Sequence, residues 1–199
     1  MLVEGFYTTL DDVFALAKTG ENEEGYILQT RYNAEGAKVK GLTAELKMGI
    51  PNAFELQMGY TFQRSRYDEP EEWSENVEPQ RRMFRTPDHY AYFTASADIT
   101  ERFKASIFGN YTGRMLVQHN AGYIENDRDE LTPQFFDAGL KLAYTFSLSD
   151  TINLEINGGV KNIFDSYQDD IDRGPFRDSV YVYGPMLPRT YFFGLKFTM

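Results

Sequence analysis

The sequence lacks cysteine, is poor in positive charge and contains no long apolar run. None of its 199 residues is Cys, which excludes a disulfide framework and cysteine-ligated zinc. Lys and Arg number 20 against 30 Asp and Glu, a net charge of -10 that argues against a nucleic-acid partner, because phosphate binding needs clustered basic residues. No stretch of about 18 apolar residues is present, so a membrane-spanning helix is excluded. The first residues contain no export signal, as in a cytoplasmic protein, a mature form or a fragment.

Catalytic and metal-binding motifs are also absent. The two histidines, His89 and His119, lie far apart without a Glu-x-x-His or His-x-x-x-His pattern, so we expect loop or strand-end residues rather than a metal pair. No Gly-x-Ser-x-Gly motif and no phosphate-binding glycine loop occurs. The sequence therefore predicts a protein that is not an enzyme and that carries no cofactor.

What the sequence has is aromatic residues, 16 Phe, 14 Tyr and 1 Trp, in segments that alternate apolar and polar positions. At the end of the chain Tyr191, Phe193, Leu195 and Phe197 alternate with Phe192, Gly194, Lys196 and Thr198. Period two indicates strands with one apolar face. Eight such strands are expected and no helix: residues 3–16, 26–50 with an interruption by a bulge at Asn33 to Gly36, 54–63, 90–99, 103–115, 136–148, 152–161 and 191–199.

The connections between these segments alternate in length. Residues 51–52, 100–101 and 149–150 are short turns, whereas 66–85, 116–133 and 165–188 are long polar loops. Short turns at one rim and long loops at the other are typical of outer-membrane β-barrels, and the polar face is rich in Gly, Ser, Thr, Asn and Gln, as a wet lumen requires. A soluble lipocalin-like barrel, with the apolar face inward, would show the same alternation and stays open.

Three stretches resemble a known family. Residues 160–165 read Val-Lys-Asn-Ile-Phe-Asp and residues 184–194 read Gly-Pro-Met-Leu-Pro-Arg-Thr-Tyr-Phe-Phe-Gly. Both resemble the last two strands of a TonB-dependent outer-membrane receptor, in the style of Bacteroidota receptors of the cobalamin and siderophore kind. Residues 38–46 resemble an earlier strand of that family, although Thr43 stands where Glu is usual.

The resemblance implies an all-β, antiparallel transmembrane β-barrel segment with short periplasmic turns and long extracellular loops. Residues 1–199 would be the C-terminal portion of the barrel, without the plug domain and the earlier strands. It would lie in the cell outer membrane and take part in uptake of a scarce nutrient chelate, namely cobalamin, a siderophore or haem. The implied partners are outer-membrane lipid, the outer-membrane assembly machinery, and TonB and the plug through the missing part. Gly194, Phe197 and Met199 resemble the C-terminal assembly signal of such barrels.

Candidate binding residues come from the loops and the polar face. Tyr90, Tyr92 and Phe108 are unexpected rings on that face, where they would pack against a plug or line a substrate path. Trp73 lies in an acidic loop that is read as a solvated surface or a ligand cover. Weak calcium candidates are Asp169, Asp170 and Asp172, with Asp165 nearby, although their spacing does not match an EF-hand. Two alternatives remain: a free-standing eight-stranded outer-membrane barrel acting as adhesin, pore or structural protein, and the lipocalin-like binder.

Overall fold

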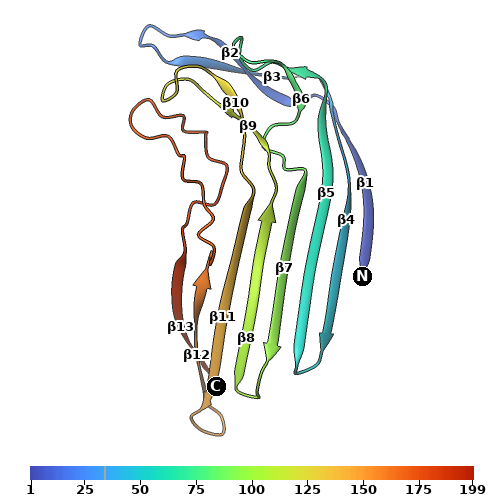
Figure 1. The fold of residues 1–199 in the computed structure, drawn as a ribbon, viewed down its shortest axis with the longest axis vertical. Coiled ribbons are helices and arrows are strands. Elements are labelled where there is room, and N and C mark those ends of the chain that lie inside the picture. The colour runs from blue at the N-terminus through green and yellow to red at the C-terminus, as the bar shows by residue number, and fades with distance from the viewer. Residues whose placement is uncertain (34) are drawn as a thin grey trace.

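The structure, a computed structural model, describes residues 1–33 and 35–199, with the side chains of residues 15–18, 21, 27 and 29 excepted. Over these residues it consists of strands and turns only (Figure 1). Within the described ranges, no helix has the length and apolar character to cross a membrane. The strands are β1 (Leu2–Leu10), β2 (Phe14–Glu21), β3 (Ile27–Asn33), β4 (Ala37–Ile50), β5 (Phe54–Glu71), β6 (Gln80–Arg82), β7 (His89–Asp98), β8 (Phe103–Thr112), β9 (Leu116–His119), β10 (Arg128–Leu131), β11 (Phe135–Ser147), β12 (Asn153–Lys161) and β13 (Thr190–Thr198).

One antiparallel sheet dominates the molecule. Its order is β1-β4-β5-β7-β8-β11-β12-β13, and the short β6 adds to the far end of β5. Consecutive long strands are therefore neighbours, which is a meander. In the described part of the chain β1 and β13 are not paired with one another and form the two edges of the sheet. The prediction of an all-β antiparallel sheet with eight meandering long strands is confirmed.

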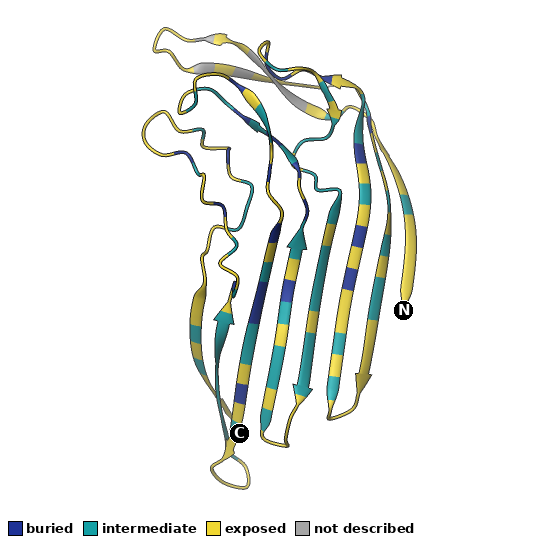
Figure 2. Ribbon diagram, in the orientation of Figure 1, coloured by how far each residue is buried: buried dark blue, intermediate teal, exposed yellow. Residues whose placement is uncertain are grey.

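The two faces of the sheet differ in exposure, as β5 illustrates. Its apolar positions Met58 and Tyr60 are 40% and 46% exposed, whereas Thr61 and Ser65 on the opposite side are 5% and 2% exposed. Figure 2 shows this alternation as bands along the strands. Exposed apolar residues occur across the sheet, namely Leu42, Met48, Ile50, Phe62, Ile107, Phe136, Leu142, Tyr144, Phe146, Tyr191, Phe193, Leu195 and Phe197. The polar face is the more covered face on β4, on the loop half of β5 and on β11, whereas on β7 and β8 polar positions such as Thr94 and Asn110 are exposed.

The alternation of short and long connections is present in the structure. Residues 51–53, 99–102 and 148–152 close tight turns at one end of the sheet, the lower end in Figure 1. The long connections, residues 72–88, 113–134 and 162–189, gather at the other end. Asn52, with a φ of 56°, takes the left-handed conformation that the tight turn after β4 requires, which asparagine tolerates better than most residues.

Two expected strands are wrong in extent. The expected strand 3–16 ends at Leu10, because the chain turns at Asp12, whose φ is 53°, and continues into β2. The expected stretch 26–50 is two strands, since β3 pairs with β2 in a separate hairpin and only β4 joins the main sheet. The expected bulge at Asn33 to Gly36 includes residue 34, which lies outside the described residues. All these segments are extended strands with similar sequence patterns. Their bounds depend on which strand each one pairs with, which the pattern does not contain.

A cluster of buried apolar residues lies in the long connections, while the sheet buries Ala37, Phe135, Ala138 and Ala143. Met115, Val117 and Tyr181 pack together with the partly buried Tyr183 against them. These residues come from the β8–β11 and β12–β13 connections, and β9 pairs with β10 within the first of these. The loops therefore form an ordered cap at one end of the sheet.

Candidate functional site: the polar face and the loop cluster

On the polar face, side chains of neighbouring strands form hydrogen bonds with one another. The hydroxyls of Thr43 and Thr61 lie 3.0 Å apart, and those of Ser96 and Ser106 lie 2.8 Å apart. Such cross-strand pairs satisfy polar side chains and add to the stability of the sheet. This face, here called the polar wall, therefore carries polar side chains that are paired across neighbouring strands.

Tyr92 and Phe108 lie flat on this wall. The Tyr92 ring covers Gly59 on β5 so closely that no Cβ fits at position 59, and its hydroxyl donates to Oε1 of Glu45 at 3.1 Å. In the same way the Phe108 ring covers Gly139 on β11. Tyr90 lies on the same face, opposite Thr61. Glycine in a strand interior often marks such a close approach.

The long connections are held together by buried side chains, here called the loop cluster. Its buried members are Trp73, Met115, Val117, His119, Asp127, Gln168, Asp172 and Tyr181. Two hydrogen bonds join the first connection to the second: the Trp73 indole donates to Oδ1 of Asp129 at 2.9 Å, and the Ser74 hydroxyl donates to Oδ2 of Asp127 at 2.6 Å. Burial raises the pKa of Asp129, and the hydrogen bond from Trp73 opposes that rise.

His119 joins the second connection to the third. Its ring stacks on Tyr181 with centroids 3.5 Å apart, and its Nε2 lies 3.0 Å from Oδ2 of Asp172. Asp172 also accepts the backbone N–H of Asp178 at 3.0 Å. Buried carboxylates need such partners, because an unpaired buried charge is costly.

Asp170 accepts hydrogen bonds from two tyrosines. The hydroxyls of Tyr181 and Tyr183 lie 3.0 Å and 2.7 Å from its carboxylate oxygens. Burial and the Asp170 carboxylate raise the pKa of both phenols, because a phenolate would be poorly solvated and would repel the carboxylate. Gln168 supports the pair by accepting the Tyr183 N–H and donating to the Tyr181 carbonyl.

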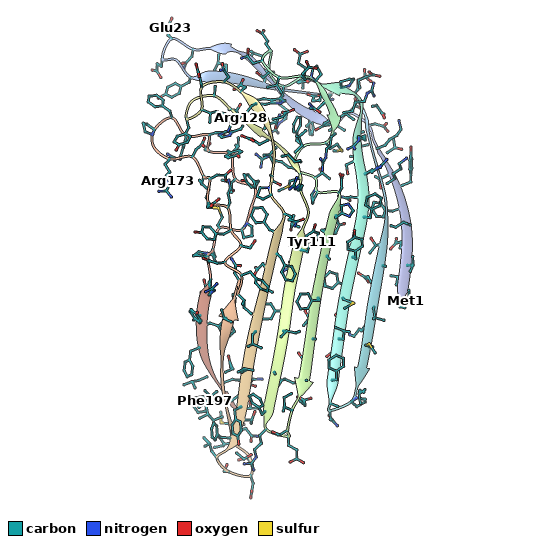
Figure 3. All side chains as sticks on the ribbon, viewed as in Figure 1. Met1, Glu23, Tyr111, Arg128, Arg173 and Phe197 are labelled. Carbon is teal, nitrogen blue, oxygen red and sulfur yellow. The ribbon has the colours of Figure 1, made fainter. Side chains whose placement is uncertain are left out.

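A polar pocket of about 390 Å³ opens beside this arrangement. Its lining combines carboxylates, guanidinium groups and aromatic rings from the second and third connections. Arg128 and Arg173, labelled in Figure 3, lie among the loops at the far end from the tight turns. Such a lining presents donors and acceptors to a polar ligand of either charge. The lining includes His119, Tyr123, Arg128, Asp169, Asp170 and Arg173.

An acidic hollow of about 470 Å³ lies between the β2–β3 hairpin and the end of β5. The Tyr32 hydroxyl donates to Oε1 of Glu71 at 2.6 Å and ties the hairpin to β5. That hydrogen bond, together with burial, raises the pKa of Tyr32 to about 12. Glu69 and Glu72 also line the hollow, so a cationic group would be favoured there.

Comparison with solved structures finds similar folds, although no family model and no curated protein matches the sequence. The ferric-catecholate import receptor Fiu of E. coli K12, in its closed form, aligns with a TM-score of 0.65 and 18% identity over 98% of this chain and 24% of that receptor. The siderophore receptor PirA of Acinetobacter baumannii gives 0.62 and 16% over 98% of this chain and 29% of that one. The ferripyoverdine receptor of the outer membrane of Pseudomonas aeruginosa gives 0.63 and 15%, over 98% and 24%.

The chain has the fold of the barrel region of TonB-dependent receptors. It spans about a quarter of the length of the receptors that it matches.

Three of the calcium candidates, Asp169, Asp170 and Asp172, line the polar pocket, but two of them are already engaged by other side chains. Asp170 is engaged by two tyrosines, Asp172 by His119, and Asp165 accepts the backbone N–H of Arg189 at 2.7 Å. Asp169 lines the polar pocket. Among the residues that the structure describes, no group of three or more His, Cys, Asp or Glu side chains is placed to hold a metal ion.

The remaining candidates are spread over the molecule. Trp73 is 5% exposed and lies in the loop cluster, and the expectation that its loop covers a ligand stays a prediction. His89 lies on the apolar face, where its Nδ1 is 2.5 Å from the Tyr60 hydroxyl. Gly194 and Phe197 lie in β13 on opposite faces, and the exposed Met199 follows the strand.

Sequence reasoning missed the loop cluster. The sequence does not single out Tyr181, Tyr183 or Val117 as site residues. His119 lies at the end of β9, in agreement with the expected loop or strand-end position, but its contacts with Asp172 and Tyr181 were not expected. A usable signal exists in the alternation of Met115, Val117 and His119 beyond β8, which marks a further short strand.

Proposed function

We propose that this chain forms part of the barrel wall, and part of the ligand-binding loops, of a TonB-dependent receptor in the cell outer membrane. The role is transport rather than catalysis. The observation that carries the proposal is the exposed apolar face of a sheet with the receptor-barrel fold. In water such a face would be a large aggregation-prone surface, whereas hydrocarbon solvates it.

The height of the apolar face fits a bilayer. Along β4 the apolar positions run from Leu42 to Ile50, which at about 3.3 Å per residue is roughly 26 Å of strand. A tilt of about 40° reduces this to roughly 20 Å, close to the apolar band of about 25 Å in outer-membrane barrels. Tyr60, Tyr111 and Phe136 lie near the loop end of this band, as interfacial aromatic residues do.

The two alternatives fit the structure less well. A lipocalin-like binder would bury the apolar face and expose the polar one, which is the reverse of the exposures on β5. A free-standing eight-stranded barrel would pair its first and last strands, yet β1 and β13 are unpaired edges in the described residues. Further strands of a larger barrel would satisfy both edges.

For the transported ligand we propose a ferric siderophore. Three of the similar structures are receptors for ferric catecholates, siderophores and ferripyoverdine by name. The polar pocket beside Arg128, Arg173 and Asp170 offers donors and acceptors to a polar chelate, and Tyr123 and Tyr181 offer aromatic surface. Capture in the loops would precede TonB-driven movement of a plug. Cobalamin and haem, which the sequence resemblance also allows, are the competing ligands.

Uptake by the source cell tests the ligand. Deletion of the gene should abolish accumulation of radiolabelled iron from one class of ferric siderophore under iron limitation. Loss of cobalamin or haem uptake instead would reassign the ligand, and unchanged uptake of all three would overturn the transport role. In the complemented strain Arg173→Gln should weaken uptake, whereas Arg102→Gln, in a tight turn at the other end, is the matched control.

Location is tested separately. The protein should be found in the outer-membrane fraction and should migrate differently in gels before and after heating. Recovery as folded, monodisperse protein in plain buffer would favour the lipocalin-like alternative and contradict the wall assignment.

A further inference from the structure

On the apolar face of β4 and β5, two pairs of basic residues follow directly on the apolar rows. Lys40 lies opposite Arg64, and Lys38 lies opposite Arg66. Like charges directly opposite one another on neighbouring strands destabilise a sheet unless something compensates them. Five apolar pairs precede them from the tight turn upward: Ile50/Phe54, Met48/Leu56, Leu46/Met58, Ala44/Tyr60 and Leu42/Phe62.

Three of these cations have no carboxylate partner. Lys38 is paired with Asp68 at 2.5 Å. Among the side chains that the structure describes, no carboxylate forms an ion pair with Lys40, Arg64 or Arg66, and Arg66 donates to the carbonyl of Ser65. Lys40 and Arg64 are exposed.

The next strand adds no free carboxylate. Arg82 on β6 lies opposite Arg66, Asp88 is paired with Arg82 at 3.0 Å, and Asp68 is paired with Lys38. On the other side, Tyr7 on β1 lies opposite Lys40 with an exposed ring. The patch of Lys40, Arg64 and Arg66 therefore presents uncompensated positive charge beside a phenol hydroxyl. In a chain with a net charge of -10 this is a local exception.

The height of the patch corresponds to lipid headgroups. It begins one row above Leu42 and Phe62, where the apolar band ends on the side of the long loops. Headgroup phosphates lie at that boundary, and each Lys or Arg near an anionic membrane surface contributes about 1 kcal/mol of attraction. Arginine in addition binds phosphate through two parallel N–H groups.

An apolar groove of about 450 Å³ lies below the patch on the same face. The small side chains of Ala44 and Ala91 leave room between larger rings, so the surface is hollowed there. Met1 and Tyr111, labelled in Figure 3, lie along its border. The other lining residues include Leu46, Met58, Tyr60, Phe93 and Phe136. A groove of this composition fits an acyl chain.

We propose that β4 and β5 form a specific site for one phosphorylated lipid of the outer leaflet, with its phosphate on Lys40, Arg64 and Arg66 and an acyl chain in the groove. The site rests on the proposed function, because it needs this face in a membrane. Bound phosphate relieves the repulsion between the paired cations. It also fixes the register of the β4–β5 hairpin at the headgroup level.

Native mass spectrometry of the full gene product, purified from outer membranes in a nonionic detergent, tests the site with phosphatidic acid as probe and phosphatidylcholine as reference. The double variant Lys40→Gln/Arg64→Gln should bind phosphatidic acid roughly 30-fold more weakly, from two charges at about 1 kcal/mol each. The matched control Lys47→Gln/Lys196→Gln removes two cations from the polar face and should bind as the unaltered protein does. Equal affinities for all three proteins would overturn the site.

A second variant separates lipid from free anion. Ala91→Phe fills the groove without changing charge and should weaken phosphatidic acid binding, while inorganic phosphate should compete only at far higher concentration than the lipid. Competition by phosphate at the same concentration, with no effect of Ala91→Phe, would leave an anion site and overturn the lipid site. Recovery of each protein in the outer-membrane fraction is measured on the same samples. If the unaltered protein is absent from the outer-membrane fraction, the proposed function is refuted. If the protein is present in that fraction and the variants bind the lipid as the unaltered protein does, only the lipid site is refuted.

Discussion

The sheet and the loop cluster bury opposite kinds of side chain. On β5 the rings and thioethers are exposed and the hydroxyls of Thr61 and Ser65 are covered. In the loop cluster Val117 and Tyr181 are buried, together with carboxylates that need specific donors. Under the proposed function this difference reflects two solvents: hydrocarbon would solvate the apolar face of the sheet, whereas loops in water must cover their own rings. Substitutions should therefore act differently in the two regions.

The largest effect is expected from a charge in the middle of the apolar face. Met58→Arg places a guanidinium near the bilayer centre and should reduce the free energy of unfolding by about 2–4 kcal/mol. The matched control is Gln57→Arg, one residue away on the polar face, beside Tyr92 and within reach of water. Urea unfolding in lipid vesicles, together with the heat-modifiable fraction in cells, measures both. Equal losses for the two variants would contradict the assignment of the faces.

Overpacking of the polar wall should cost less. Gly59→Val pushes a side chain into the Tyr92 ring and should destabilise the sheet by about 1–3 kcal/mol. Because the three atoms nearest to a Cβ at position 59 belong to Tyr92, the double variant Gly59→Val/Tyr92→Ala should recover part of that loss. A double-mutant cycle by urea unfolding measures the coupling. No recovery would mean that the ring does not set the limit at this position.

In the loop cluster the effect should be local. Trp73→Phe removes the indole donor and leaves the Asp129 carboxylate without it, which should weaken the contact between the first two long connections by about 1–3 kcal/mol. Limited proteolysis within residues 72–88 and 113–134 should accelerate, while urea unfolding of the sheet stays unchanged. Sheet unfolding that shifts as much as proteolysis would show that wall and loops fold as one unit.

The sequence predicted the wall well and the loops poorly, for a physical reason. Alternation such as Phe54 to Phe62 is a local pattern, and a face follows from it directly. The loop cluster depends on contacts between distant residues, such as Trp73 with Asp129 and His119 with Tyr181, which no local pattern contains. The pairing of β2 with β3 was missed for the same reason.

The residues of the proposed lipid site show a second limit of prediction from sequence. Lys40 and Arg64 belong to strands whose existence was predicted, yet their opposition requires the register of the pair. Once register is known, two cations separated by 24 positions in the chain become neighbours. The sequence pattern therefore predicts on which face of a strand a residue lies. A site formed by residues of two strands is found only when the pairing register of those strands is known.

The smallest effect at ordinary pH concerns the phenols of the loop cluster. Burial and Asp170 raise the pKa of Tyr181 and Tyr183 in the folded protein above the unfolded value of about 10. The contribution of these protonated phenols to stability is then fully present below about pH 10 and is lost only as pH rises through the folded values. The same sign applies to Tyr32, whose window runs from about pH 10 to about 12.

Phenolate absorbance during an alkaline titration measures this. The double variant Tyr181→Phe/Tyr183→Phe should remove two of the latest titrating groups among the 14 tyrosines. Asp170→Asn keeps both rings and removes the repelling carboxylate, so it should move their ionisation to lower pH while burial still holds it above the ordinary range. Unchanged titration in Asp170→Asn would mean that burial alone sets these pKa values. The hydrogen bonds from the two phenols to Asp170 would then hold the two rings in position in the pocket without changing their pKa values.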